Sequence, residues 1–261
     1  MSAGGVHPVA AGGFSASASV YSRIRPTYAR AAIGRIAELV RATPDASDAR
    51  VLDVAAGTGI LTGQLTRARL QCTALEPLDE MIGQLRRALP ATPCARGTAE
   101  SLPFRDRSFD AVSVAQAFHW FDAPRALAEI ARVLRADGVV VLAWNVRDPS
   151  VPWVAELDDL VESRSGGRPY SNHDPDHWAG VLDAAGSFEP MVEERFDNPI
   201  ATTVDGVIDR VRSISFVATM SEPERDALLG EARTLLVDGH GLVGTFEYPH
   251  HTVLDWATRP R

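Results

Sequence analysis

The chain has few cysteines, no long apolar run and no excess of basic residues. Cys72 and Cys94 are its only cysteines among 261 residues. Two thiols cannot form a zinc cluster by themselves, so we expect reduced cysteines in a cytoplasmic protein. No apolar run approaches the ~18 residues that a membrane-spanning helix needs. The net charge of −8 at pH 7 disfavours nucleic acid and anionic membranes as partners.

The first 20 residues differ in composition from the rest. They are rich in glycine, alanine and serine, and they lack the basic and apolar regions of a signal peptide. We expect residues 1–20 to form a flexible tail and residues 21–261 to form one domain, which is long enough to bury a large core. Within this domain we expect a core at 21–145, covered by helices and closing strands at 146–261.

Strand and helix patterns alternate along the core, as in a doubly wound parallel sheet with helices on both faces. Apolar periodicity predicts strands at 51–54, 72–75, 111–114 and 139–143, and helices at 32–40, 60–66, 81–89 and 124–134. Asp79 is expected to cap the helix at 81–89. Beyond Trp144 the pattern predicts helices at 152–164, 178–185, 207–216 and 222–237, and strands at 193–196 and 245–256. The fold class is α/β.

A loop of small residues follows the first predicted strand, in the sequence VLDVAAGTGILT at 51–62. Gly57 and Gly59 have no Cβ and can adopt positive φ, so the main chain can lie against a ligand there. Dinucleotides and S-adenosylmethionine are the two ligands bound by such a loop. A dinucleotide fingerprint needs a third glycine where Thr62 stands. The carboxylate of Asp53 suits a ligand with an ammonium and a sulfonium better than a diphosphate.

Further motifs follow the loop in a fixed order. They are Glu76 at the end of the second strand, GTAESLPF at 97–104, SFDAV at 108–112 and RVLRADG at 132–138. With the glycine loop, this set resembles the class I S-adenosylmethionine-dependent methyltransferases, most of all the ubiquinone/menaquinone-biosynthesis and trans-aconitate methyltransferase-like branch. The resemblance covers residues 21–144, and Ala55 departs from it where many members have glycine. It implies a Rossmann-like sheet of seven strands, mostly parallel with an antiparallel final strand, an N-terminal helix and a helical insertion over the active site.

The resemblance also implies a cofactor site for S-adenosylmethionine, with S-adenosylhomocysteine as the product. Glu76 stands where doubly wound sheets place a carboxylate on ribose hydroxyls, although a solvated loop acid would look the same. The segment Thr98, Ala99 and Glu100 is similar to the family's adenine-contacting segment. The other expected cofactor-binding residues of the strand-end loops are Asp53, Ala55, Gly57, Thr58, Gly59, Pro77 and Met81.

The segment after the fourth predicted strand should reach the ligand-binding edge of the sheet. Gln116 and Ala117 are expected beside the methionine part of the cofactor. His119 is the candidate catalytic base, because an unperturbed imidazole titrates near neutrality, although a histidine between two aromatic residues is often simply packed. We expect His119, Trp120 and Trp144 to line the substrate pocket.

Two further segments are candidate sites. Tyr21 and Arg25 resemble the family's N-terminal segment that closes over the cofactor, with Tyr21 at the catalytic centre and Arg25 on the methionyl carboxylate; surface positions are the alternative. A loop holds His173, Asp174, Asp176 and His177, the residue types of a metal site. Asp176 more simply caps the next helix, so we expect no metal. His250 and His251 are expected on two faces of a strand.

We therefore predict methyl transfer from the sulfonium to a small organic molecule, by family resemblance to a hydroxyl or carboxylate oxygen, with nitrogen or carbon as alternatives. A carboxylate acceptor would need no base. Two other interpretations stay open: an NAD-dependent oxidoreductase, which would share the sheet and Glu76, and a non-catalytic S-adenosylmethionine-binding protein. A monomer and a homodimer are both compatible with the sequence.

Overall fold

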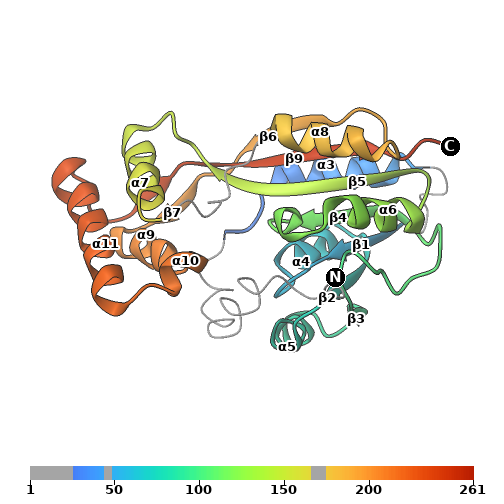
Figure 1. Ribbon diagram of the computed structural model, residues 1–261, viewed down its shortest axis with the longest axis horizontal. Helices are drawn as coiled ribbons and strands as arrows, with labels where there is room; N and C mark the ends of the chain where they lie inside the picture. The colour runs from blue at the N-terminus through green and yellow to red at the C-terminus, as the bar shows by residue number, and fades with distance from the viewer. Residues whose placement is uncertain (1–25, 44–48, 166–174) are drawn as a thin grey trace.

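The computed structural model describes residues 26–43, 49–165 and 175–261. Its largest sheet has seven strands, and helices lie on both sides of it (Figure 1). The strand order is β3-β2-β1-β4-β5-β9-β6. The first five strands run parallel, and β9 is antiparallel to both β5 and β6. The strands are β1 (Arg50–Val54), β2 (Gln71–Glu76), β3 (Cys94–Arg96), β4 (Phe109–Ala115), β5 (Leu134–Arg147), β6 (Val192–Asp197) and β9 (His250–Thr258). This confirms the predicted α/β fold with its antiparallel closing strand.

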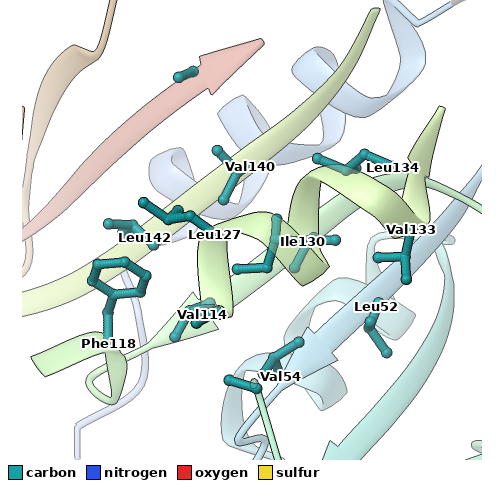
Figure 2. Packing of buried hydrophobic residues seen from close by; sticks show 14 of the residues in the cluster. Leu52, Val54, Val114, Phe118, Leu127, Ile130, Val133, Leu134, Val140 and Leu142 are labelled. Atoms are coloured by element: carbon teal, nitrogen blue, oxygen red, sulfur yellow. The ribbon is translucent and has the colours of Figure 1, made fainter. Parts of the chain in front are cut away.

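Helices cover both faces of this sheet because apolar residues alternate along its central strands. On β5, Val139 and Val141 face one core, while Val140 and Leu142 face the other core, on the opposite side of the sheet. The helices of the two layers are α3 (Arg30–Arg41) and α4 (Ile60–Arg67) on one face, and α6 (Ala123–Val133) and α8 (Pro175–Ala185) on the other. Figure 2 shows the second core, in which Leu127 and Ile130 of α6 pack over the strands.

A second group of elements lies beyond the far ends of β5 and β9 (Figure 1). It has its own apolar core, built around residues such as Trp153, Leu157, Val207 and Leu228. We call it the insertion lobe. Its elements are α7 (Pro152–Glu162), β7 (Ile200–Thr202), α9 (Val204–Arg212), α10 (Ser215–Ala218), α11 (Glu222–Thr234), the π-helical turn η3 (Leu235–Gly239) and β8 (Phe246–Tyr248). Because α7 follows the end of β5, the lobe adjoins the carboxyl edge of the parallel strands, where such sheets bind ligands.

Several predicted boundaries were wrong. The predicted strand at 245–256 is two strands, because Pro249 separates β8, which pairs with β7, from β9, which pairs with β5 and β6. The helix predicted at 207–216 ends at Arg212, and the one at 222–237 changes to a π-helical turn after Thr234.

Two predicted caps were also wrong. Leu78 holds the N-cap position of α5 (Asp79–Ala88), so Asp79 is the first helical residue, and its carboxylate pairs with Arg96 at 3.1 Å. Asp176 lies inside the first turn of α8. Both acids still interact favourably with the positive end of a helix dipole, which explains their preference for the first turn.

No helix among the described ranges is long and apolar enough to cross a membrane.

Candidate active site

The glycine loop joins β1 to α4 at the carboxyl edge of the sheet. Its backbone enters the left-handed region three times, at Ala55 (φ +54°), Gly57 (φ +58°) and Gly59 (φ +85°). A Cβ on Gly59 would lie 3.0 Å from Leu89 Cδ1, whereas a Cβ on Gly57 would meet no described residue within 4 Å, apart from its two chain neighbours. The main chain at Gly57 is therefore open to a ligand, and the alanine that replaces the family's first glycine adopts a glycine-like conformation, which is rare for a residue with a Cβ.

Glu76 lies against this loop. Its side chain ends β2 and is only 4 % exposed. Its Oε2 accepts the Gly57 N–H at 2.9 Å and its Oε1 accepts the Leu78 N–H at 3.0 Å. Burial raises the pKa of this carboxyl above its usual value, and the Asp53 charge adds to the rise. The structure thus brings Glu76 into direct contact with the glycine loop.

Asp53 points beneath the loop between α4 and β4, and is 1 % exposed. Its Oδ2 accepts the Thr62 hydroxyl at 2.5 Å and its Oδ1 accepts the Ser113 hydroxyl at 2.9 Å. Burial raises the pKa of this carboxyl to about 6, although both hydroxyls lower it. The sequence predicted a carboxylate facing the ligand, whereas the structure buries the carboxylate under the loop, where its charge can act through space.

The surroundings of the loop are therefore negative. Asp53 and Glu76 are both buried, and among the described residues no cationic side chain forms an ion pair with either of them or shifts its pKa. Buried carboxylates without a cationic partner are unfavourable unless a ligand compensates them. This arrangement suits a positively charged ligand and opposes a diphosphate.

The burial of Asp53 predicts an unusual dependence of stability on pH. In the folded chain this carboxyl binds its proton up to about pH 6, whereas in the unfolded chain it does so only up to about pH 4. Its contribution to the free energy of unfolding therefore falls as the pH rises from about 4 to about 6, by about 3 kcal/mol in total. We expect Asp53→Asn to remove this decline and to stabilise the ligand-free protein above pH 6, as measured by urea unfolding at a series of pH values.

Asp110 provides a matched control for that experiment. It is also buried, but it accepts the Arg50 N–H at 2.8 Å and pairs with Arg135 at 2.7 Å. Asp110→Asn should destabilise the protein at neutral pH, because it removes a paired charge. Equal destabilisation by both substitutions would contradict the expected effect of burial at Asp53.

The predicted adenine-contacting segment follows β3. Thr98 pairs with Ser101 in an isolated bridge, Ala99 is buried, and Glu100 Oε1 accepts the Asp122 N–H at 3.1 Å, next to the start of α6. The remaining predicted cofactor residues of this side are Thr58, which is buried in the glycine loop, Pro77, which follows β2, and Met81, which is buried in α5. Their contacts with a cofactor stay predictions.

The segment after β4 contains a strained residue and an aromatic group. Gln116 has φ +55°, which is uncommon for a residue with a Cβ. Ala117 precedes the short helix η2 (Phe118–Trp120), in which the His119 ring lies 4.6 Å from Trp120 and 5.8 Å from Trp144. Strained backbone of this kind clusters at functional sites.

Trp144 lies deeper than the other two residues of the predicted substrate pocket. It is 3 % exposed, and its indole stacks on Trp178 at 5.6 Å. Its Nε1–H donates to Asp255 Oδ2 at 3.0 Å. Trp144 therefore supports His119 from the core side, and direct contact between Trp144 and an acceptor stays a prediction.

Tyr21, Arg25, His173 and Asp174 lie outside the described residues. Across the ranges that the structure covers, no group of three or more histidine, cysteine or acidic side chains has the geometry of a metal site.

The sequence interpretation missed a set of polar side chains near the carboxyl edge of the parallel strands. They are Gln64, Asn145, Asn198 and Thr252. Of these four residues, only Asn145 could have been found from the sequence, because it is a polar residue near the end of a predicted central strand.

Comparison with known proteins agrees with this geometry. Residues 52–142 match the family described as a methyltransferase domain. An uncharacterized methyltransferase of Mycobacterium tuberculosis is 36 % identical over 247 residues, which are 94 % of this chain and 95 % of the relative. The chain is a class I S-adenosylmethionine-dependent methyltransferase.

Solved structures show the same fold for this methyltransferase. The YcgJ protein from Bacillus subtilis superposes with a TM-score of 0.54 at 21 % identity, covering 89 % of this chain and 100 % of that one. Phosphoethanolamine N-methyltransferase 2 of Haemonchus contortus, in complex with S-adenosyl-L-methionine, superposes with a TM-score of 0.52 at 18 % identity, covering 87 % of this chain and 52 % of that one. Family membership supports S-adenosylmethionine as the cofactor of this methyltransferase and implies a methyl acceptor.

Proposed function

We propose that this methyltransferase transfers the methyl group of S-adenosylmethionine to an oxygen atom of a small organic molecule, with the cofactor held at the glycine loop. The carrying observation is the pair of buried carboxylates, Asp53 and Glu76, at a loop whose main chain is open at Gly57. A sulfonium and an ammonium would supply the positive charge that this region lacks among its described residues.

Different residues of the site would bind different parts of the cofactor. Gly57 lets the main chain approach the nucleoside. Glu76 has acceptor sites beyond those that bind the Gly57 and Leu78 N–H groups, and these would accept ribose hydroxyls. Gln116 and Ala117 would lie beside the methionyl part. The bound cofactor supplies an activated methyl group on sulfur, so the protein contributes mainly alignment and exclusion of water, which in principle provide about 7–11 kcal/mol.

The reaction is an in-line displacement. An acceptor oxygen forms a bond to the methyl carbon, the carbon–sulfur bond breaks, and its electron pair stays on sulfur as the neutral thioether of S-adenosylhomocysteine. A hydroxyl acceptor must also lose its proton, and we assign that proton to His119, on η2 at the carboxyl end of β4. A carboxylate acceptor loses no proton.

The cytoplasmic location, the single domain and the monomeric or homodimeric state stay predictions.

Ligand binding tests the cofactor assignment directly. We expect S-adenosylhomocysteine to raise the melting temperature of the full chain and NADH to leave it unchanged. The opposite pattern would overturn the assignment. Incubation with radiolabelled S-adenosylmethionine and fractionated metabolites then tests turnover, and label recovered in base-labile methyl esters identifies a carboxylate acceptor.

Removal of the His119 imidazole separates the two acceptor classes. We expect His119→Ala to leave affinity for S-adenosylhomocysteine within about threefold of the wild type, because the ring lies with Trp120 and Trp144 and not on the glycine loop. Turnover of a hydroxyl acceptor should fall by about 10²–10⁴-fold, whereas turnover of a carboxylate acceptor should fall far less.

His240 supplies the control for this substitution. It lies in the insertion lobe, where its Nε2 is 3.0 Å from Glu156, so His240→Ala should not change the rate with a hydroxyl acceptor by a comparable factor. Unchanged turnover by His119→Ala with a hydroxyl acceptor would exclude His119 as the base.

A further inference from the structure

We infer that Asn145 is a positioning residue for the cofactor site, through which residues 26–29 and the Gln116 segment are held in register with the strand ends. The inference rests on the proposed cofactor role of this edge. Asn145 lies near the end of β5, next to the strand β4 that leads into Gln116.

The Asn145 side chain is bonded on both of its polar atoms. Its Oδ1 accepts the Thr252 hydroxyl at 2.7 Å and the Asn198 amide at 3.0 Å. Its Nδ2 donates to the carbonyls of Pro26 and Thr27, each at 3.3 Å. One amide therefore ties β9 and the end of β6 to the segment that enters α3.

The same segment is fixed from two more directions. The Ala29 N–H donates to Thr252 Oγ1 at 2.8 Å, and Asn198 Nδ2 donates to the Thr27 carbonyl at 2.8 Å. On the other side, Gln64 of α4 accepts the Tyr28 N–H at 2.9 Å and donates to the Tyr28 carbonyl at 2.8 Å. Residues 26–29 thus bridge β5 and β9 to the helix that starts at the glycine loop.

Asn145 also holds Gln116 through its main chain. Gln116 Nε2 donates to the Asn145 carbonyl at 3.1 Å, while the Gln116 N–H donates to the Ala143 carbonyl at 2.9 Å. Because Gln116 has positive φ, surrounding bonds must maintain its conformation. The Asn145 side chain bonds residues 26–27, and Gln64 of α4 bonds the neighbouring Tyr28. We expect loss of the Asn145 side-chain bonds to loosen residues 26–29 and, by a shift of the Asn145 main chain, the Gln116 segment that bonds its carbonyl.

Two substitutions remove these bonds with little change in shape. Asn145→Asp keeps the acceptor for Thr252 and Asn198 but turns the donor that faces two carbonyls into an acceptor. Thr252→Val removes the hydroxyl that bonds both Ala29 and Asn145, and valine has nearly the same volume as threonine. Thr252→Ser keeps the hydroxyl and should restore binding.

The test is calorimetric titration with S-adenosylhomocysteine, together with initial rates over a range of S-adenosylmethionine concentrations. We expect Asn145→Asp and Thr252→Val to raise Kd and KM at least tenfold while kcat stays within threefold, and Thr252→Ser to bind within twofold of the wild type. Hydrogen exchange at the Ala29 amide should accelerate in both weakened variants.

Glu194→Gln is the structural control, because Glu194 bonds Arg35 and Trp256 across α3, β6 and β9 without reaching Gln116. It should leave Kd unchanged even if it lowers the melting temperature. Wild-type binding with unchanged Kd in Asn145→Asp and Thr252→Val overturns this inference alone. Failure of the wild type to bind S-adenosylhomocysteine overturns the proposed function, and this inference with it.

Discussion

Gly57→Val is expected to abolish binding of S-adenosylhomocysteine while the chain stays folded. Gly57 has φ +58°, a conformation that costs a residue with a Cβ roughly 1–2 kcal/mol and a β-branched residue more. Among the described residues, none except the two chain neighbours has an atom within 4 Å of the new Cβ position, so the valine side chain would occupy the space proposed for the nucleoside. We expect Kd to rise at least about 100-fold in calorimetric titration.

Gly186 offers a matched control for the backbone strain. It has φ +62°, and a Cβ added to it would also meet no described residue within 4 Å apart from its chain neighbours. It lies between α8 and β6, away from the glycine loop. Gly186→Val should lower stability by a similar amount and leave Kd unchanged. Normal binding by Gly57→Val, or equal loss of binding in both variants, would contradict the proposal that the cofactor binds at this loop.

The architecture of the sheet was predictable because its signals are local. The four core strands appear as short apolar runs, and the order of motifs around Gly57 and Glu76 fixes the end of each strand at which loops emerge. The contact between Gly57 and Glu76 follows from this arrangement, because β1 and β2 are parallel neighbours.

The rest depended on partners that are distant in the sequence. Nothing near Asp53 indicates that Ser113, 60 residues away, would hold its carboxylate in the interior. Thr252 bonds Ala29 across 223 residues and Asn145 across 107, and such pairs exist only once the antiparallel β9 is placed beside β5. Local helix preference likewise suggested Asp79 as a cap, whereas Leu78, with extended backbone (φ −96°, ψ 123°), is the boundary residue.

Glu76→Ala should raise the Kd of the cofactor about 100-fold, because two interactions are lost. The charged oxygen proposed for the ribose disappears, which removes charge-assisted hydrogen bonds worth about 1.5–3 kcal/mol. The Gly57 N–H also loses its acceptor at 2.9 Å, so the loop is less well held in the binding conformation. Stability should change little, because relief of a buried charge offsets the unsatisfied N–H groups of Gly57 and Leu78.

Asp110→Ala separates this effect from the general loss of a buried carboxylate. Asp110 also accepts a backbone N–H of β1, that of Arg50, but it lies at the amino end of the strands, opposite the glycine loop. Its replacement should lower the free energy of unfolding and leave Kd for S-adenosylhomocysteine unchanged. Because Glu76→Ala is expected to show the reverse pattern, calorimetric titration and urea unfolding of the two variants together separate a binding residue from a structural one. A Glu76→Ala protein that binds as tightly as the wild type would show that this carboxylate neither binds the cofactor nor is needed to hold the loop in its binding conformation.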